Sequence, residues 1–345
     1  MKAELGTYPK DRQILHEVIP LETPLAIDLH VTHYCNFKCN YCVLSASEEQ
    51  IKKSGFPLEV MSWDLFERFI DQIKEFKDPI KMITMSGVGE ATTHPRIVDM
   101  VRELRKSGKV KTIQIVSNGA LIDKKMGQEL VNAGLSELRI SLQGMNEKKY
   151  KEIAKVDFDW DKFYENMVYF SKIKGECTLK IKIVDSALDT GDEEKFYKLF
   201  GDICDAVAIE HVYDAWAVNQ YNLDLKGADE SKTRYGDAKR VVGVCPRVFT
   251  RLDVLPDGSL TQFCHTKFGH EKNIMDMTLK ELWTCKEQNQ LRGDMLSGKM
   301  MEFEQCRRCT FITNTWHEED ILDGYEEKIM EQMREKGFLV GTTYE

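Results

Sequence analysis

Three cysteines with an uneven spacing are the clearest candidates for chemistry in this sequence. Cys35, Cys39 and Cys42 lie in the run Cys-Asn-Phe-Lys-Cys-Asn-Tyr-Cys. A structural zinc site takes four ligands, and a [4Fe-4S] cluster held by protein alone takes four thiolates. Three thiolates complete neither site, so a cluster bound here would keep one iron open. The alternatives are an incomplete zinc site or three reduced cysteines in a loop.

An aromatic residue, Tyr41, precedes the last cysteine, and the run resembles the motif of the radical S-adenosylmethionine (SAM) superfamily. The resemblance implies that the three cysteines hold a [4Fe-4S] cluster whose open iron is chelated by SAM. Reduction would then cleave SAM to methionine and a 5′-deoxyadenosyl radical, which takes a hydrogen atom from an unactivated carbon. An electron donor such as flavodoxin or ferredoxin would be a partner.

Short polar motifs follow the next three expected strands. They are Ser-Gly-Val-Gly-Glu at 86–90, Ser-Asn-Gly at 117–119 and Ser-Leu-Gln-Gly at 141–144. Glycines let a backbone approach a ligand closely, and a carboxylate beside them can hold an ammonium. The resemblance makes these segments the SAM site, with a valine between the two glycines of the first. The implied cofactor-binding residues are Tyr41, Gly87, Gly89, Glu90, Ser117, Asn118, Ser141 and Gln143.

A second cysteine set follows near the C-terminus. Its members are Cys245, Cys264, Cys306 and Cys309. Four thiolates brought together by a hairpin and a CxxC turn can hold zinc or an iron-sulfur cluster, and spacing alone slightly favours zinc. The flanking residues, including Leu-Pro-Asp-Gly-Ser-Leu at 255–260, resemble the SPASM/Twitch extension of radical SAM enzymes. That resemblance implies one auxiliary [4Fe-4S] cluster, with no iron left open for substrate.

The elements around these motifs alternate between strand and helix. Apolar β-rich runs at 25–31, 82–85, 112–116, 137–141, 179–184 and 206–212 predict strands. Amphipathic segments at 63–76, 95–107, 124–133, 160–173 and 193–200 predict helices, several with Asp, Ser or Thr at the N-cap. This order predicts an α/β fold of parallel β/α units, a partial (β/α)6 TIM barrel with the cysteines at the C-terminal end of the first strand.

The remainder of the chain is expected to form smaller parts. We predict an N-terminal extension at 1–24, the barrel at 25–225, a linker at 225–235 and a SPASM/Twitch domain at 240–312. The last would contain a β-hairpin around Pro256-Asp257-Gly258 and a helix at 278–295. The C-terminal part at 313–345 is predicted to form a helix at 318–336, with an apolar stripe of Ile321, Tyr325, Ile329 and Met333.

Composition excludes several function classes. Hydrophobic residues make up 42% and charged residues 30% of the chain, with a net charge of −9 spread along it. This offers no basic footprint for nucleic acid or for a membrane surface. No signal peptide or spanning segment is evident, so we expect a cytoplasmic protein whose cysteines are thiols or metal ligands.

The substrate is the least determined part. We favour a radical SAM oxidoreductase or epimerase acting on a small polar molecule such as an amino sugar, cyclitol or nucleotide sugar. The alternative is maturation of a ribosomally made peptide by epimerisation, thioether formation or crosslinking. Such enzymes often carry a larger N-terminal domain and more cysteines than this chain. A non-catalytic metal-binding scaffold is the distant alternative.

The mechanism would depend on the fate of the substrate radical. In a dehydrogenase, a base removes a proton and the auxiliary cluster accepts an electron, and His211 or Asp214 could be this base. In an epimerase, a thiol donates a hydrogen atom. Cys285 is the first candidate for that thiol, with Cys204 and Cys177 as the others, although packing is the more common role of such cysteines.

Overall fold

The computed structural model describes residues 1–6, 12–53, 58–215, 223, 225, 229–261 and 272–339. Its centre is one nine-stranded sheet with the order β1-β7-β6-β5-β4-β3-β2-β8-β9. The strands are β1 (Glu4–Leu5), β2 (Ala26–Leu29), β3 (Ile80–Met85), β4 (Val110–Ser117), β5 (Glu137–Leu142), β6 (Thr178–Val184), β7 (Ala206–Glu210), β8 (Arg251–Val254) and β9 (Leu260–Thr261). The edge strands β1 and β9 do not pair with each other, so the barrel is open.

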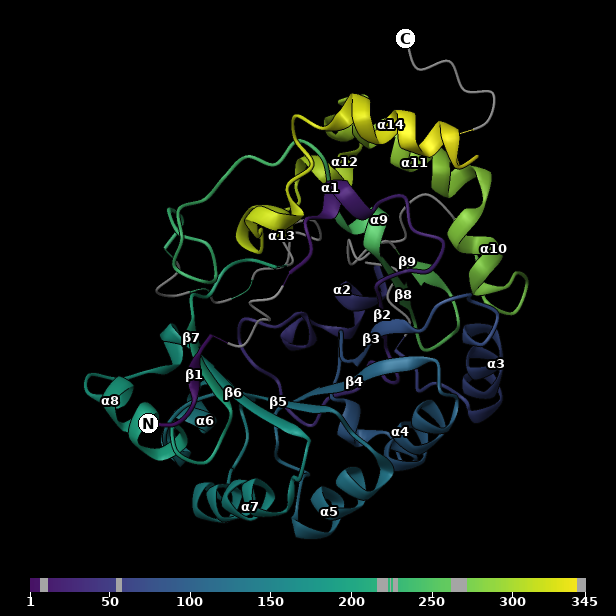
Figure 1. Ribbon diagram of the computed structural model, residues 1–345. Coiled ribbons are helices and arrows are strands. Elements are labelled where there is room, and N and C mark those ends of the chain that lie inside the picture. The colour runs from purple at the N-terminus through teal and green to yellow at the C-terminus, as the bar shows by residue number, and fades with distance from the viewer. Residues whose placement is uncertain are drawn as a thin grey trace.

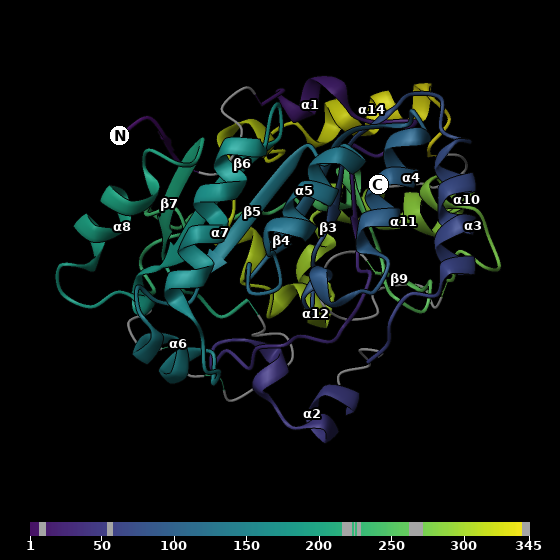
Figure 2. The same ribbon diagram turned by 90° about the horizontal axis from the view of Figure 1, so that it is seen from below.

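Helices cover the outer side of this curved sheet. They are α3 (Trp63–Ile73), α4 (Ile97–Lys106), α5 (Lys124–Ala133), α7 (Trp160–Ile173) and α8 (Asp192–Phe200). Figures 1 and 2 show them outside the arc of strands, while α2 (Glu48–Lys53) lies apart from it. The six predicted strands and five predicted helices are confirmed. A further helix, α6 (Glu147–Ile153), follows β5 and was not predicted.

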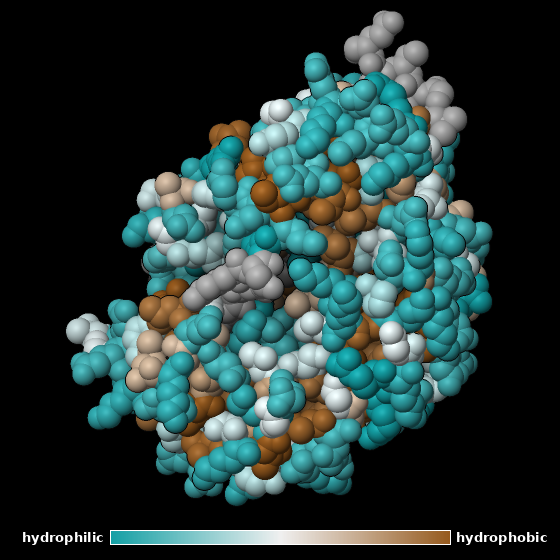
Figure 3. All heavy atoms as spheres, viewed as in Figure 1, coloured by the Kyte–Doolittle hydropathy of each residue, from teal (hydrophilic) through white to brown (hydrophobic). Residues whose placement is uncertain are grey.

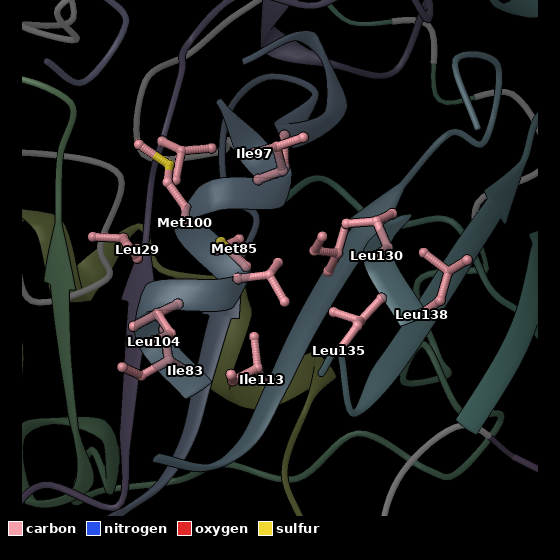
Figure 4. Close-up of a cluster of buried hydrophobic side chains, with 14 of the residues drawn as sticks. Leu29, Ile83, Met85, Ile97, Met100, Leu104, Ile113, Leu130, Leu135 and Leu138 are labelled. Atoms are coloured by element: carbon pink, nitrogen blue, oxygen red, sulfur yellow. The ribbon is translucent and has the colours of Figure 1, made fainter. Parts of the chain in front are cut away.

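The alternation of side chains along each strand divides the sheet into an apolar and a polar face. In β6, Leu179, Ile181 and Ile183 are buried against the helices, while Lys180 and Lys182 lie on the other face. The helices supply the complementary stripe with helical spacing. Figure 4 shows α4 placing its apolar side chains over β3 and β4; these include Ile97, Met100 and Leu104 on the helix and Ile83, Met85 and Ile113 on the strands.

N-caps fix where several of the helices begin. The hydroxyl of Ser62 accepts from the backbone N–H of Leu65 at 3.2 Å, and Asp123 accepts from that of Met126 at 2.8 Å. Each cap satisfies a backbone donor that the first helical turn leaves without an intrahelical partner.

The predicted β-hairpin forms at the edge of the barrel sheet. Its first strand, β8, pairs in parallel with β2, placing Ile27 beside Leu252 and Asp28 beside Asp253. By contrast, β9 runs antiparallel to its neighbour β8. The hairpin therefore continues the barrel sheet, because the edge of β2 away from β3 would otherwise leave its backbone groups unpaired.

The chain on either side of the hairpin forms a helical layer along the open side of the arc (Figure 1). Its helices are α9 (Arg247–Thr250), α10 (Leu279–Thr284), α11 (Lys286–Leu296), α12 (Glu304–Arg307), α13 (Phe311–Asn314) and α14 (Glu326–Glu335). The single helix predicted at 278–295 is wrong, because Cys285 is extended (ψ 158°) and divides α10 from α11. The C-terminal helix is shorter than predicted, but Ile329 and Met333 are buried as the stripe requires.

The layer is attached to the barrel by buried polar contacts. Gln72 on α3 donates to the carbonyl oxygen of Ile274 at 2.7 Å and accepts from the N–H of Leu279 at 3.1 Å. The N-terminal helix α1 (Leu15–Val18) packs into the same layer through Leu15. On the face shown in Figure 3, most of the surface is hydrophilic. Within the described ranges, no helix has both the length and the apolar character needed to cross a membrane.

Candidate active site at the carboxyl ends of the strands

A cavity of about 320 Å³ lies where the carboxyl ends of the parallel strands converge. All three cysteines of the CxxxCxxC run line it, together with the motifs that follow β3, β4 and β5. Parallel β/α folds place their ligand sites at this edge of the sheet. The lining includes each of the predicted cofactor-binding residues, namely Tyr41, Gly87, Gly89, Glu90, Ser117, Asn118, Ser141 and Gln143.

The three cysteines share one environment. Burial raises the pKa of the Cys39 thiol well above its ordinary value, and the neighbouring Cys42 and Cys35 raise it further. Burial likewise raises the pKa of Cys35 to about 11. Such crowded thiols become thiolates only when a bound metal supplies positive charge. The Sγ of Cys35 accepts from the N–H of Phe37 at 3.3 Å, which orients it.

The number of these donors fits a cluster with one open iron. Cys35, Cys39 and Cys42 supply three thiolates, one fewer than a closed structural zinc site takes. In a [4Fe-4S] cluster each thiolate binds its own iron, so three thiolates would hold three of the four irons.

The glycines after β3 are required by close approach to the loop that carries the cysteines. Gly87 and Gly89 both have φ of +108°. A Cβ on Gly87 would lie 2.3 Å from the ring of His30, and one on Gly89 would lie 2.3 Å from the carbonyl oxygen of Thr32. Val88, between them, is buried in a small apolar cluster. The two glycines thus allow the β3 loop to lie directly against the segment preceding Cys35.

Glu90 is a buried carboxyl group on the wall of the cavity. Its Oε1 accepts from the hydroxyls of Thr92 at 2.6 Å and Ser117 at 2.8 Å. Its Oε2 accepts from the N–H of Asn118 at 2.6 Å. Burial nevertheless raises the pKa of this carboxyl. A cation placed beside Oε2 would stabilise the ionised form, which is the environment that an ammonium group of a ligand would provide.

Two further contacts tie the cysteine loop to the strand ends. The hydroxyl of Tyr41 donates to Oε1 of Gln143. The side-chain amide of Asn118 lies 3.8 Å from Sγ of Cys35 and donates to Asn36 Oδ1 at 2.8 Å. The structure therefore brings together residues that lie 102 and 83 positions apart in the sequence, as the resemblance implied. Their roles as ligand contacts stay predictions.

The second cysteine set converges in part. Burial raises the pKa of the Cys306 thiol to about 12, with Cys245 and then Cys309 adding to the effect. The N–H of Cys309 donates to the carbonyl of Cys306 at 3.1 Å, as in a tight CxxC turn. Cys264 lies outside the described residues. Three of the four predicted ligands are thus electrostatic neighbours, and the fourth stays a prediction.

A histidine and an aspartate form a pair on the cavity wall. Nδ1 of His211 lies 2.6 Å from Oδ2 of Asp185, and the other carboxylate oxygen accepts from the N–H of Val212 at 3.2 Å. His211, which lines the cavity, was predicted. Asp185 was missed, although its position one residue after β6 was available as a signal in the sequence.

The remaining predicted catalytic residues lie elsewhere. Cys285 is the N-cap of α11 and accepts from the N–H of Gln288 at 3.5 Å. Cys177 and Cys204 are packed in the main apolar core. The backbone carbonyl of Asp214 accepts from the hydroxyl of Thr310. None of these four residues is part of the described lining of the cavity.

Comparison with known protein families identifies the strand–helix part of this architecture. The model of the Radical SAM superfamily matches residues 29–200. A tungsten-containing aldehyde ferredoxin oxidoreductase cofactor-modifying protein of Pyrococcus furiosus is 34% identical over 114 residues, covering 33% of this chain and 29% of the relative. A probable GTP 3′,8-cyclase of Methanococcus vannielii is 31% identical over 131 residues, covering 38% of this chain and 40% of the relative. The chain thus spans well under half the length of either relative.

Similar solved structures extend the likeness over most of the chain. Native anSMEcpe with bound AdoMet superposes with a TM-score of 0.56 at 18% identity, covering 91% of this chain and 97% of that one. BtrN in complex with AdoMet and 2-DOIA gives 0.54 at 14% identity, covering 86% and 97%. SuiB of Streptococcus suis bound to S-adenosylmethionine gives 0.52 at 16% identity, covering 80% and 69%. At these identities the likeness is one of fold.

Proposed function

Because the chain belongs to the radical SAM superfamily, with its radical SAM domain at residues 29–200, we propose that it removes a hydrogen from a C–H bond of a small polar substrate. The product would be a dehydrogenated or epimerised molecule of the amino sugar, cyclitol or nucleotide sugar class. The residues that would hold the first cluster are Cys35, Cys39 and Cys42, and those that would hold an auxiliary cluster are Cys245, Cys264, Cys306 and Cys309. When bound, the first cluster and SAM would supply the hydrogen-abstracting radical, and the second cluster would supply an acceptor for one electron.

One observation carries the choice of a small polar substrate. A second cavity, of about 470 Å³, lies inside the arc of strands. Its wall combines apolar side chains, such as Phe311 and Ile312, with polar residues of β2, β3, β4 and β5, including Asp28, Thr84, Gln114 and Arg139. It shares Ser86, Gly87, Val116, Lys182, Ala215 and Arg234 with the cavity at the cysteines. A volume of this size suits a small molecule. The shared wall would bring the substrate beside SAM.

The His211 and Asp185 pair supports dehydrogenation over epimerisation. Nδ1 of His211 lies within hydrogen-bond distance of Asp185. An ionised carboxylate can only accept, so Asp185 would hold the proton on Nδ1 and leave Nε2 as the proton acceptor. His211 would take a proton from the substrate after hydrogen abstraction. Epimerisation requires a thiol facing the substrate. Within the described lining of both cavities, the only thiols are those of Cys35, Cys39 and Cys42.

Peptide maturation is the second candidate, and one comparison favours it. SuiB, which shares the fold, has also been solved bound to the precursor peptide SuiA, with a TM-score of 0.52 over 80% of this chain. A peptide substrate would need an open groove, whereas the 470 Å³ cavity lies within the arc of strands. We therefore keep the small molecule as the main proposal.

The proposal is tested with anaerobically reconstituted protein, reduced and incubated with SAM and candidate substrates in deuterated water. Loss of two hydrogens without gain of deuterium supports dehydrogenation, and gain of one deuterium supports epimerisation. A panel of short peptides run in parallel tests the second candidate. Absence of 5′-deoxyadenosine under every reducing condition would overturn the proposed function as a whole.

A further inference from the structure

Among the charged side chains that line the cavity inside the barrel, basic ones outnumber acidic ones. Among its described residues, the cations are Arg12, Lys81, Arg139, Lys182, Arg234, Arg247 and Arg251, and the anions are Asp28 and Asp320. The protein as a whole has a net charge of −9. The basic lining is therefore a local feature, opposite in sign to the rest of the molecule.

Asp28 shows how these cations are balanced on one side of the cavity. Its Oδ2 lies 3.0 Å from Nη1 of Arg251 and 3.3 Å from Nη2 of Arg247. One carboxylate oxygen thus serves two guanidinium groups. Burial opposes ionisation of Asp28, but Arg251 and Arg247 outweigh it and lower its pKa. Arg247 also lies over the ring of Phe311 at 4.6 Å, which holds its guanidinium in place.

The next carboxylate, Asp253, offsets little of this positive charge. It lies beside Asp28 in the register of β8 and β2. Burial first, and then the charge of Asp28, raise the pKa of Asp253 well above its ordinary value. Asp253 therefore favours its neutral form, and Asp28 is the carboxylate that both arginines contact.

The opposite side of the cavity repeats the arrangement. Oε2 of Glu210 lies 2.8 Å from Nζ of Lys182 and also pairs with Arg234. Behind it, Glu137 pairs with Arg139 at 3.0 Å and with Lys180 at 2.7 Å. Glu210 and Glu137, like Asp28, thus each contact two cations. Holding positive charge in excess away from water is costly unless an anion completes the site.

The position of the cations relative to the cysteines sets the direction of a bound ligand. Lys182 and Arg234 belong to both cavities, whereas Arg247 and Arg251 line only the inner one. A substrate whose reacting carbon lies beside the SAM cavity would direct its other end toward Arg247 and Arg251. Arginine pairs of this kind recognise phosphoryl and carboxyl groups through bidentate hydrogen bonds.

The geometry points to a substrate that carries an anionic group, phosphoryl or carboxyl. Arg247 and Arg251 would bind this group in the part of the inner cavity that is not shared with the cavity at the cysteines. This inference rests on the proposed function, because the same cavity is taken as the substrate site. It narrows the substrate class to acidic molecules, such as a nucleotide sugar or a sugar acid. An unmodified aminocyclitol, which is cationic, would be disfavoured by like-charge repulsion.

Calorimetry on the reconstituted full chain tests the inference, with inorganic pyrophosphate and malonate as separate probes at fixed ionic strength. We expect one of the two to bind with a dissociation constant below about 1 mM. The Arg251→Gln variant should weaken that binding about tenfold or more, because it removes one of the two guanidinium groups in that part of the cavity. Preference for pyrophosphate identifies a phosphoryl group, and preference for malonate a carboxyl group.

Two further variants keep the test decisive. Arg102→Gln is the matched control, because Arg102 pairs with Asp99 on the outside of α4 and its loss should leave probe affinity within about twofold of the parent. If Arg251→Gln does not fold, Lys81→Gln replaces it, since Lys81 lines the cavity but is exposed. Lys81→Gln should weaken binding about threefold. Equal affinity in Arg102→Gln and in the cavity variant would overturn the inference, as would the absence of binding by both probes.

The outcome separates this inference from the function on which it rests. Formation of 5′-deoxyadenosine by the parent protein, with no binding of either anion, removes the anionic substrate and leaves the radical SAM function in place. The opposite result is also informative. If an anion binds and Arg251→Gln weakens that binding, but no 5′-deoxyadenosine forms under any reducing condition, the proposed reaction is wrong and the anion site stands.

Discussion

Oδ2 of Asp185 lies 2.6 Å from Nδ1 of His211, although 26 positions separate the two residues in the chain. The register of the sheet explains the contact. Val184 and Glu210 are the last paired residues of the neighbouring parallel strands β6 and β7. The next residue of each strand is therefore brought to the same point of the rim, where a carboxylate can orient an imidazole.

Replacing Asp185 by asparagine should impair proton removal without removing the histidine. Because an amide at this position would no longer fix the proton on Nδ1 of His211, we expect kcat to fall by roughly 10²-fold or more, while the KM for SAM stays unchanged. The variant should still form 5′-deoxyadenosine but uncouple it from product. The ratio of 5′-deoxyadenosine to product measures this. Glu193→Gln, on the exposed side of α8, is the control and should keep the parent ratio.

Replacing Gly89 by alanine should disrupt the loop after β3 more than the backbone angle of Gly89 alone explains. The new Cβ would lie 2.3 Å from the carbonyl oxygen of Thr32 in addition to the strain of a φ of +108°. Gly324→Ala is matched, since Gly324 has a φ of +89° and no atom within 4 Å of the added Cβ. The backbone strain should cost each variant about 1–3 kcal/mol of unfolding free energy. Only Gly89→Ala should also lose SAM affinity in equilibrium dialysis; equal affinity in both would contradict the close-approach argument.

Single cysteine replacements should each remove about half of the iron bound per chain. Two [4Fe-4S] clusters give about eight irons per chain, so Cys39→Ala and Cys306→Ala should each fall to about four. Cys264→Ala should behave as Cys306→Ala does if it is the fourth ligand of the second set. Cys177→Ala, which removes a buried thiol of the core, should keep the full iron content. Iron and sulfide assays measure this. One zinc and four irons per chain in the parent would show that the second cysteine set holds zinc instead of an auxiliary cluster.

The Glu210 carboxylate should contribute to stability in acid. Burial opposes its ionisation, but Arg234 and Lys182 prevail and lower the pKa from 4.5 to about 2. A carboxyl whose folded pKa is depressed contributes stability above its unfolded value of 4.5 and loses it as the pH falls toward 2. The amount is roughly 3 kcal/mol. Urea unfolding of the parent across this acid range should show the loss. The Glu210→Gln variant should have a lower free energy of unfolding than the parent at neutral pH, and that free energy should change less as the pH falls.

The two cysteine sets differ in how much of each metal site the sequence alone could predict. Cys35, Cys39 and Cys42 lie within one short loop, so their proximity follows from spacing alone, and the family comparison supports their assignment. The auxiliary set depends on long-range folding. The structure brings Cys245, Cys306 and Cys309 into one another's electrostatic range, while the predicted ligand role of Cys264 stays to be tested.

The sequence by itself determined the alternation of strands and helices, because local periodicity sets which face of each element is apolar. It also determined that the polar motifs lie at the carboxyl ends of strands, because each follows its strand directly. The tertiary structure decided what lies beside what. It placed β8 in the barrel sheet next to β2, broke the predicted helix at Cys285, and paired Asp185 with His211. It also gathered cations from distant segments around one cavity. Those relationships depend on strand order and register, which are fixed by packing between residues far apart in the chain and leave no local pattern in it.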